Sequence, residues 1–137
     1  VYYFQSGKKM MEGEFKNGNK IGVWVYYFDN GQKKRRGEYK NGKGNGKWSF
    51  WYKNGQMEKE GPMVDDKKVG LFTYFYENGK KKKEGAFKED KEEGEWTFWN
   101  DSGELKEKVR FVNGERAEDN IDESKTKKSA DEKKKGD

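Results

Sequence analysis

Apolar and polar residues alternate along several short stretches of the chain, which is the pattern of β-strands. In residues 24–28, Trp24, Tyr26 and Phe28 share one face of a strand, and Val25 and Tyr27 lie on the other. Aromatic side chains favour strands, and no window shows the sustained 3.6-residue period of a helix. The pattern predicts an all-β protein whose core face carries the first of these two sets.

The strands belong to a unit that recurs every 24 residues without insertion. A fixed period of this length is the signature of a repeat architecture. The positions that keep the period are Gly7, Gly31, Gly55, Gly79 and Gly103; Gly22, Gly46, Gly70 and Gly94; Gly13, Gly37, Gly61 and Gly85, with Val109 in the fifth place; and Trp24, Trp48, Phe72 and Trp96. We expect an elongated single-layer array of about five β-hairpin repeats over residues 1–116, with roughly ten strands about 4.8 Å apart. The chain begins inside a repeat, as a fragment or a processed product would.

Two kinds of turn separate the strands of each unit. One contains Asn-Gly, as at Asn30-Gly31, where both residues tolerate positive φ and predict a tight hairpin. The other follows eleven residues later, as at Asn41-Gly42. In the next two units this second turn reads Asp65-Asp66 and Glu89-Asp90, and we expect a different turn type there.

Glycine also recurs in the middle of strands, where it costs roughly 0.5–1 kcal/mol relative to alanine. The positions are Gly13, Gly37, Gly61 and Gly85. A glycine that recurs at such a place indicates a close approach of an aromatic ring or a sharp bend.

The composition excludes several kinds of site. The 137 residues contain no Cys and no His, so there is no disulfide, thiolate nucleophile, cysteine zinc site or histidine general base. Charged residues make up 42% of the chain, but aromatic residues make up 16%, and these favour a folded core over disorder. We assign no catalytic residue, metal ligand or cofactor; Asp65-Asp66 fits a turn better than a calcium loop.

The last residues differ from the rest. From Ala117 to Asp137 there is no aromatic residue, and Ile121 is the only large apolar one. Low hydrophobicity with mixed charge predicts a flexible charged tail at 117–137.

The repeat resembles the MORN repeat (membrane occupation and recognition nexus). The segment from Gly37 to Trp48, with Gly-Glu-Tyr, an Asn-Gly turn and a later glycine, carries the resemblance, and Gly13 to Gly22 matches it as well. The longer period and the hairpin at Tyr52 to Gln56 are more similar to the bacterial variant, whose members are often labelled antitoxin-like. The resemblance covers roughly residues 1–116. It implies an array of β-hairpins that acts as a scaffold or interaction module, and the antitoxin label implies neutralising a partner protein.

One column of aromatic residues lies on the face opposite the core. Its members are Tyr3, Tyr27, Trp51, Phe75 and Trp99. A half-exposed aromatic column can hold a peptide, a sugar or a quaternary ammonium group, whereas the structural alternative is stacking between repeats. This column is our first candidate for an interface.

Two basic runs occupy equivalent places in repeats two units apart. They are Lys33, Lys34, Arg35 and Arg36, and Lys80, Lys81, Lys82 and Lys83. They are candidate contacts for phosphates or an anionic lipid surface. Alternation divides each run between two faces, and lysines also protect exposed strands from edge pairing, so we favour a solvated surface over anion binding.

These observations predict a non-enzymatic scaffold that binds another protein along its ribbon. The alternatives are a module that binds anionic lipid headgroups or cell-wall glycan, and an accessory region of a larger enzyme whose catalytic part is absent. Nucleic acid is a poor fit for a partner, and self-association through the ends of the array is a further expectation. A cytoplasmic or membrane-peripheral location fits best, with an upstream signal left open.

Overall fold

The computed structural model describes residues 1–117. Every regular element in this range is a strand, which confirms the all-β class. The tail expected at 117–137 lies outside the described residues except for Ala117. The strands are β1 (Tyr2–Tyr3), β2 (Lys9–Lys16), β3 (Asn19–Tyr27), β4 (Lys33–Lys40), β5 (Lys43–Trp51), β6 (Met57–Val64), β7 (Lys67–Lys68), β8 (Gly70–Phe75), β9 (Lys81–Lys88), β10 (Lys91–Trp99), β11 (Leu105–Val112) and β12 (Glu115–Arg116).

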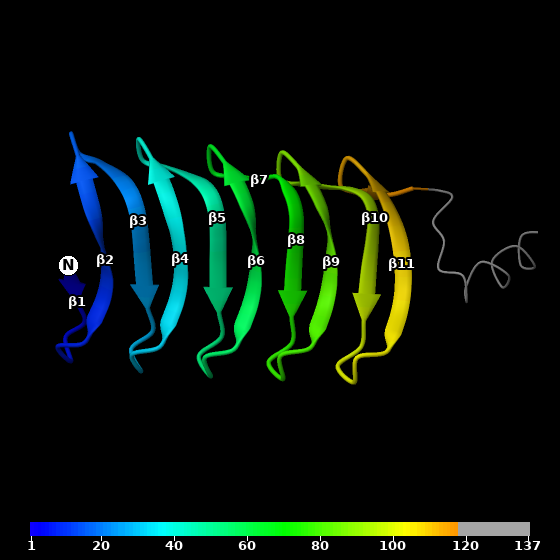
Figure 1. The fold of residues 1–137 in the computed structure, drawn as a ribbon, viewed down its shortest axis with the longest axis horizontal. Helices are drawn as coiled ribbons and strands as arrows, with labels where there is room; N and C mark the ends of the chain where they lie inside the picture. Colours follow the sequence, from blue (N-terminus) through cyan, green and yellow to red (C-terminus); the bar gives the residue numbers. More distant parts are fainter. Residues whose placement is uncertain (118–137) are drawn as a thin grey trace, which may run out of the picture.

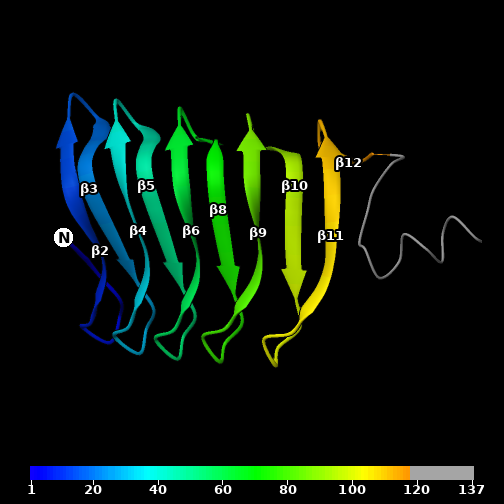
Figure 2. The ribbon, with the colours of Figure 1, turned by 45° about the vertical axis from the view of Figure 1, so that its right-hand side comes forward.

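The strands form one open antiparallel sheet in the order of the sequence, with β7 paired to β6 beside β8. Figures 1 and 2 show a single row of hairpins, each placed next to the one before it. Each hairpin therefore contacts mainly its two neighbours, as in other repeat proteins. This is the elongated single-layer array that the 24-residue period predicts.

The mid-strand glycines make room for the core rings, as expected from their spacing. A Cβ added to Gly13 would lie 2.2 Å from the Trp24 ring, and one added to Gly37 would lie 2.0 Å from the Trp48 ring. The partner strand also bulges here, because Glu12 and Glu14 pair with Val25 and Ile21. The bulge lets the indole lie flat over the glycine backbone.

A file of aromatic rings along this face forms the core. Trp24 is 0% exposed and Trp96 is 1% exposed. Neighbouring rings meet edge to face, for example Phe15 with Trp24 at 4.9 Å and Phe87 with Trp96 at 5.0 Å between ring centres. Such contacts add to the burial of large aromatic area. In the fifth repeat Val109 occupies the glycine place and is 1% exposed, so the ring-over-glycine contact is not repeated on β11.

The second turn of each repeat keeps one geometry throughout, so the expectation of a different type in the third and fourth units is wrong. Asn41 and Gly42 have φ of 49° and 82°, and Asp65 and Asp66 have 48° and 69°. Two consecutive positive φ values define the two-residue type I′ hairpin. Asp66 tolerates this conformation because its carboxylate accepts a hydrogen bond from the backbone N–H of Gly44 in the preceding repeat. Asp90 accepts the equivalent bond from Lys68 at 2.7 Å.

The first turn is longer than the tight hairpin that Asn30-Gly31 suggested. Only Gly31 has a positive φ, of 89°. The N–H of Gly31 donates to Phe28, and the N–H of Phe28 donates to Gln32, which closes a three-residue loop ending in a left-handed glycine. Asn30 then has a different role, because its side-chain amide donates to the carbonyl of Lys53 in the next repeat at 2.9 Å. Asn54 and Asn78 repeat this link, so the loops are joined along the ribbon.

A candidate interaction surface opposite the core

The aromatic column lies on the face of the sheet opposite Trp24. The hydroxyl of Tyr27 donates to Oε1 of Glu12 at 2.7 Å. Glu12 is the cross-strand partner of Val25, and Val25 points away from the face that carries Trp24. Tyr3 is 57% exposed, whereas the other four rings are half-buried. We call this column the stripe; its members are Tyr3, Tyr27, Trp51, Phe75 and Trp99.

Each stripe ring has a fixed neighbour on the next strand. Tyr27 pairs with Lys33 and Phe75 pairs with Lys81. Trp51 pairs with Met57 in the same way, as Tyr3 does with Lys9 and Trp99 with Leu105. Since one ring occurs every two strands, the rings recur about every 9.6 Å along the ribbon. The stripe is thus a row of large apolar surfaces separated by long flexible side chains.

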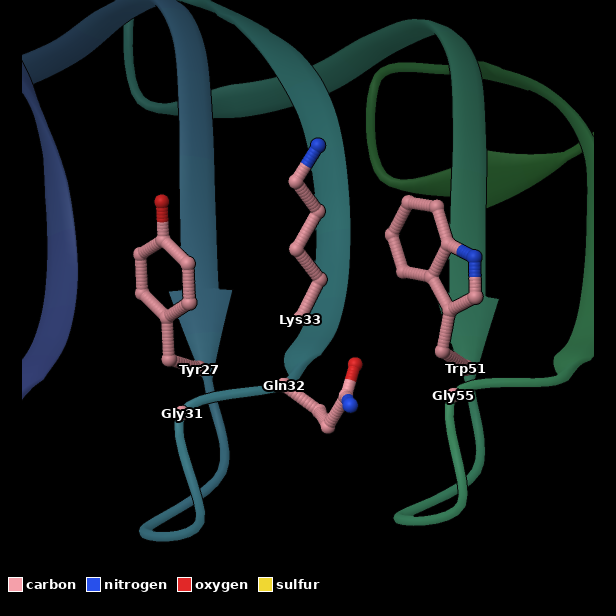
Figure 3. A pocket seen from close by; sticks show the side chains of 6 residues that line it. All are labelled: Tyr27, Gly31, Gln32, Lys33, Trp51 and Gly55. Carbon is pink, nitrogen blue, oxygen red and sulfur yellow. The ribbon is translucent and has the colours of Figure 1, made fainter.

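A shallow groove opens between the first two half-buried rings of the stripe. Figure 3 shows Tyr27 and Trp51 standing on the same side of the sheet with Lys33 between them. The groove has a volume of about 390 Å³, and Gly31, Gln32 and Gly55 also line it. The Lys33 ammonium lies 5.9 Å from the centre of the Trp51 ring, within cation–π range. The groove offers flat apolar walls with one cation.

The hydrogen bond from Tyr27 changes the acidity of its partner. It is the main reason why the pKa of Glu12 lies below its ordinary value, with a further hydrogen bond from Lys9. The same bond raises the pKa of Tyr27, because it favours the protonated phenol. Glu12 therefore stays ionised and holds the first half-buried ring of the stripe in place.

The basic runs do not form two matching patches. Tyr27 pairs with Lys33 and Phe75 with Lys81, so Lys81 is the equivalent of Lys33 and the runs are offset by one residue. The expectation that the two runs occupy equivalent places is therefore wrong. Lys80 is equivalent to Gln32 and lies in the loop, where its ammonium donates to the carbonyl of Ser102. Anion binding by these side chains stays a prediction.

Successive residues of each run point to different surroundings. Lys34 lies over the Phe28 ring and Lys82 over the Tyr76 ring, at 5.8 and 5.6 Å. Arg35 lies over Tyr26 on the core face, and Arg36 pairs with Val25 on the stripe face. Each run therefore divides its charge between the two faces, as alternation predicted.

Sequence reasoning missed one regular set of side chains on the core face. Arg35, Lys59 and Lys83 are 24 residues apart and each covers a core aromatic ring. Their 24-residue spacing can be read from the sequence. However, Lys59 lies between two glutamates and so does not belong to a run of like charge. Their geometry is described below.

Two further kinds of feature were sought in the described part of the chain, a metal-binding cluster and a membrane-spanning helix. Within residues 1–117 no group of three or more Asp, Glu, His or Cys side chains is placed to hold a metal ion. The same residues contain no helix long and apolar enough to cross a membrane.

Comparison with known families gives one match. The MORN repeat variant matches four segments, residues 20–41, 45–65, 68–89 and 92–113, which together cover more than half of the chain. Each segment covers most of a strand that carries a core ring, the first turn and the following strand. Each ends at the first residue of a type I′ turn. A search of curated proteins found no match. With its array of β-hairpins and four matched repeats, the chain belongs to the MORN repeat variant family.

Proposed function

We propose that this chain is a non-enzymatic repeat scaffold that binds another protein along its ribbon through the stripe. The single observation that carries the proposal is the regular row of partly exposed large rings on the face that the core does not use. Trp51 and Trp99 contribute the largest rings. Aromatic side chains are enriched at protein interfaces, where they supply large contact areas.

The stripe fits a partner that presents apolar side chains along an extended surface. Burial of a half-exposed ring adds apolar area with little loss of side-chain freedom. Lys33 and Lys81 lie beside the rings of Trp51 and Trp99 and can donate to carbonyl or carboxylate groups of the same partner. Membership of the MORN family supports a scaffold role. Neutralising a toxic partner, as the antitoxin label of similar proteins implies, is one form that this binding would take.

A pull-down from lysate of the source organism tests the proposal. The full chain is compared with a Trp51→Ala, Trp99→Ala variant and with a control, Val64→Ala, Leu71→Ala, that removes exposed apolar side chains outside the stripe. We expect one discrete protein that is retained at high salt by the parent and the control and lost by the stripe variant, with direct binding of the purified pair.

Two results would reject the proposal. One is a captured protein that the stripe variant retains as well as the parent does. The other is recovery of lipid, glycan or nucleic acid alone, with binding that disappears at high salt and ignores the stripe substitutions; this would favour a surface-binding module.

A further inference from the structure

A second regular row crosses the core face, and it alternates aromatic rings with cations. Direct cross-strand pairing connects Tyr26 to Arg35, Arg35 to Phe50, and Phe50 to Lys59. The same pairing continues through the later repeats. In order the row is Tyr26, Arg35, Phe50, Lys59, Tyr74, Lys83 and Phe98. We call it the cation–aromatic row.

Each cation lies against the rings beside it. The Arg35 guanidinium is 4.1 Å from the centre of the Tyr26 ring, and the Lys59 ammonium is 4.7 Å from that of Phe50. Lys83 lies 4.7 Å from the Tyr74 ring centre. The three side chains are half-buried, so their positions are set by the rings and their charged ends are held in line along the ribbon.

Among the described residues these cations form no ion pair, although the carboxylates of Glu58 and Glu92 act on Lys59 and Lys83 from nearby. Within residues 1–117, none of Arg35, Lys59 and Lys83 takes part in an ion pair. Nε of Arg35 is buried without a hydrogen-bond acceptor. A buried donor without an acceptor costs free energy, and half-buried like charges in one row repel each other. The pKa values of Lys59 and Lys83 lie below the ordinary lysine value, first because of burial. Neighbouring lysines lower them further, and Glu58 and Glu92 act in the opposite direction. The row is therefore ready to accept negative groups from outside.

The spacing of the row indicates which negative groups fit. One cation occurs every two strands, or about every 9.6 Å. A polyproline II helix has three residues per turn and rises about 3.1 Å per residue, so every third side chain returns to the same face after about 9.3 Å. A peptide in this conformation with an acidic residue at every third position would match the three cations almost in register. Aromatic-lined grooves are also the surfaces on which proline-rich segments dock.

A groove of about 490 Å³ lies beside the row. Its lining includes Phe28, Phe50, Trp51 and Tyr52 together with the basic residues Lys34, Arg35 and Lys53. Its aromatic residues offer flat surfaces that suit proline rings between the acidic residues. Glu58 and Glu77 also line this groove, and they disfavour a continuous polyanion. Duplex DNA carries one charge for about each 1.7 Å of its axis, far denser than the cations of the row.

We propose that the cation–aromatic row binds an extended, proline-containing segment of a partner protein in which every third residue is Asp or Glu. The segment crosses the strands along the ribbon axis, its carboxylates on Arg35, Lys59 and Lys83 and its prolines against the rings between them. The three cations lie on the face opposite the stripe, and Trp51 of the stripe also lines the groove beside them.

Fluorescence anisotropy with a labelled peptide of Glu-Pro-Pro triplets tests the proposal on the full chain. We compare Lys59→Gln, Lys83→Gln with a control, Lys33→Gln, Lys81→Gln, which removes the same charge from the stripe face. Glutamine keeps much of the stem that covers each ring, and circular dichroism checks the fold of both variants. The row variant should lose about tenfold or more in affinity, and the control should bind like the parent.

Two control peptides test whether binding depends on the charge and on the spacing of the acidic residues. A Gln-Pro-Pro peptide should not bind, and a peptide with the same number of acids at every fourth residue should bind more weakly. The proposal is overturned if the parent does not bind the Glu-Pro-Pro peptide at low salt, if both charge variants weaken binding equally, or if a single-stranded oligonucleotide of equal charge binds more tightly. The stripe variant of the pull-down keeps Arg35, Lys59 and Lys83, and the row variant keeps Trp51 and Trp99. The two experiments therefore test different side chains, and failure of one proposal leaves the other to its own test.

Discussion

At the scale of single residues, the fold depends on glycines in the middle of strands, because a residue with a Cβ would collide with a core ring. Gly61 is typical, since a Cβ there would lie 2.3 Å from the Phe72 ring. The sequence showed that glycine recurs at this position, which indicated the close approach of an aromatic ring. It could not show that the opposing strand bulges by two residues to bring the ring over, because a bulge depends on register between strands.

Gly61→Ala should destabilise the protein by about 1–3 kcal/mol, because the added methyl group overpacks a filled site. Denaturant unfolding followed by far-ultraviolet circular dichroism measures the change. The control places the same substitution in a Phe72→Leu background, where a smaller side chain leaves space and the added cost should shrink. An equal cost in both backgrounds would mean that backbone conformation, and not the ring, demands glycine.

A second residue-scale prediction concerns Glu12. Tyr27→Phe removes the hydroxyl that chiefly lowers the pKa of this carboxylate, so the Glu12 pKa should rise toward its ordinary value. In the parent, the lowered pKa stabilises the fold above the pKa of the unfolded chain, and this contribution is lost as pH falls through the folded pKa. The stability difference between the two proteins should therefore shrink on acidification.

Titration of the Glu12 side chain by nuclear magnetic resonance measures this directly. Tyr52→Phe is the control, because the Tyr52 hydroxyl donates to the backbone carbonyl of Phe75 and to no carboxylate. A Glu12 pKa that is the same in the parent and in Tyr27→Phe would show that the hydrogen bond is absent in solution.

At the scale of elements, the hairpins were predictable and their connections were not. The alternation around Trp24 and the Asn-Gly pairs identified strands and turns. The type I′ geometry of Asp65-Asp66 and Glu89-Asp90 was missed, because the hydrogen bond that supports Asp66 comes from Gly44 in another repeat. The hydrogen bond from Asn30 to Lys53 was missed for the same reason. The residues of a turn predict its local backbone conformation, but they do not predict its contacts with another repeat.

Asp90 tests this explanation of the turns. Asp90→Ala should cost about 1–2 kcal/mol, because alanine is strained at a φ of 70° and loses the bond from the N–H of Lys68. Asp90→Asn should change stability little, since asparagine tolerates the left-handed region and keeps the acceptor oxygen. Thermal unfolding of both variants decides the matter, and equal destabilisation by alanine and asparagine would contradict it.

At the scale of the whole molecule, the two faces of one sheet differ in the burial of their aromatic side chains. On one face the glycines let rings lie flat and become buried, and on the other a column with the same 24-residue period stays half-exposed. Alternation in the sequence assigns these two columns to opposite faces, and this assignment needs no knowledge of register. It did not reveal the row of Arg35, Lys59 and Lys83, because their alignment depends on the pairing of strands from β4 to β9.

The most direct test of this division is the free energy of unfolding of Trp48→Ala beside that of Trp51→Ala, two tryptophans three residues apart on opposite faces of β5. Trp48 is buried over Gly37, so its loss should cost about 3–5 kcal/mol. Trp51 stands at the edge of the stripe groove, and its loss should cost about 1 kcal/mol or less while partner binding falls. If Trp51→Ala destabilises the protein as much as Trp48→Ala does, the stripe belongs to the core and the division between the faces is wrong.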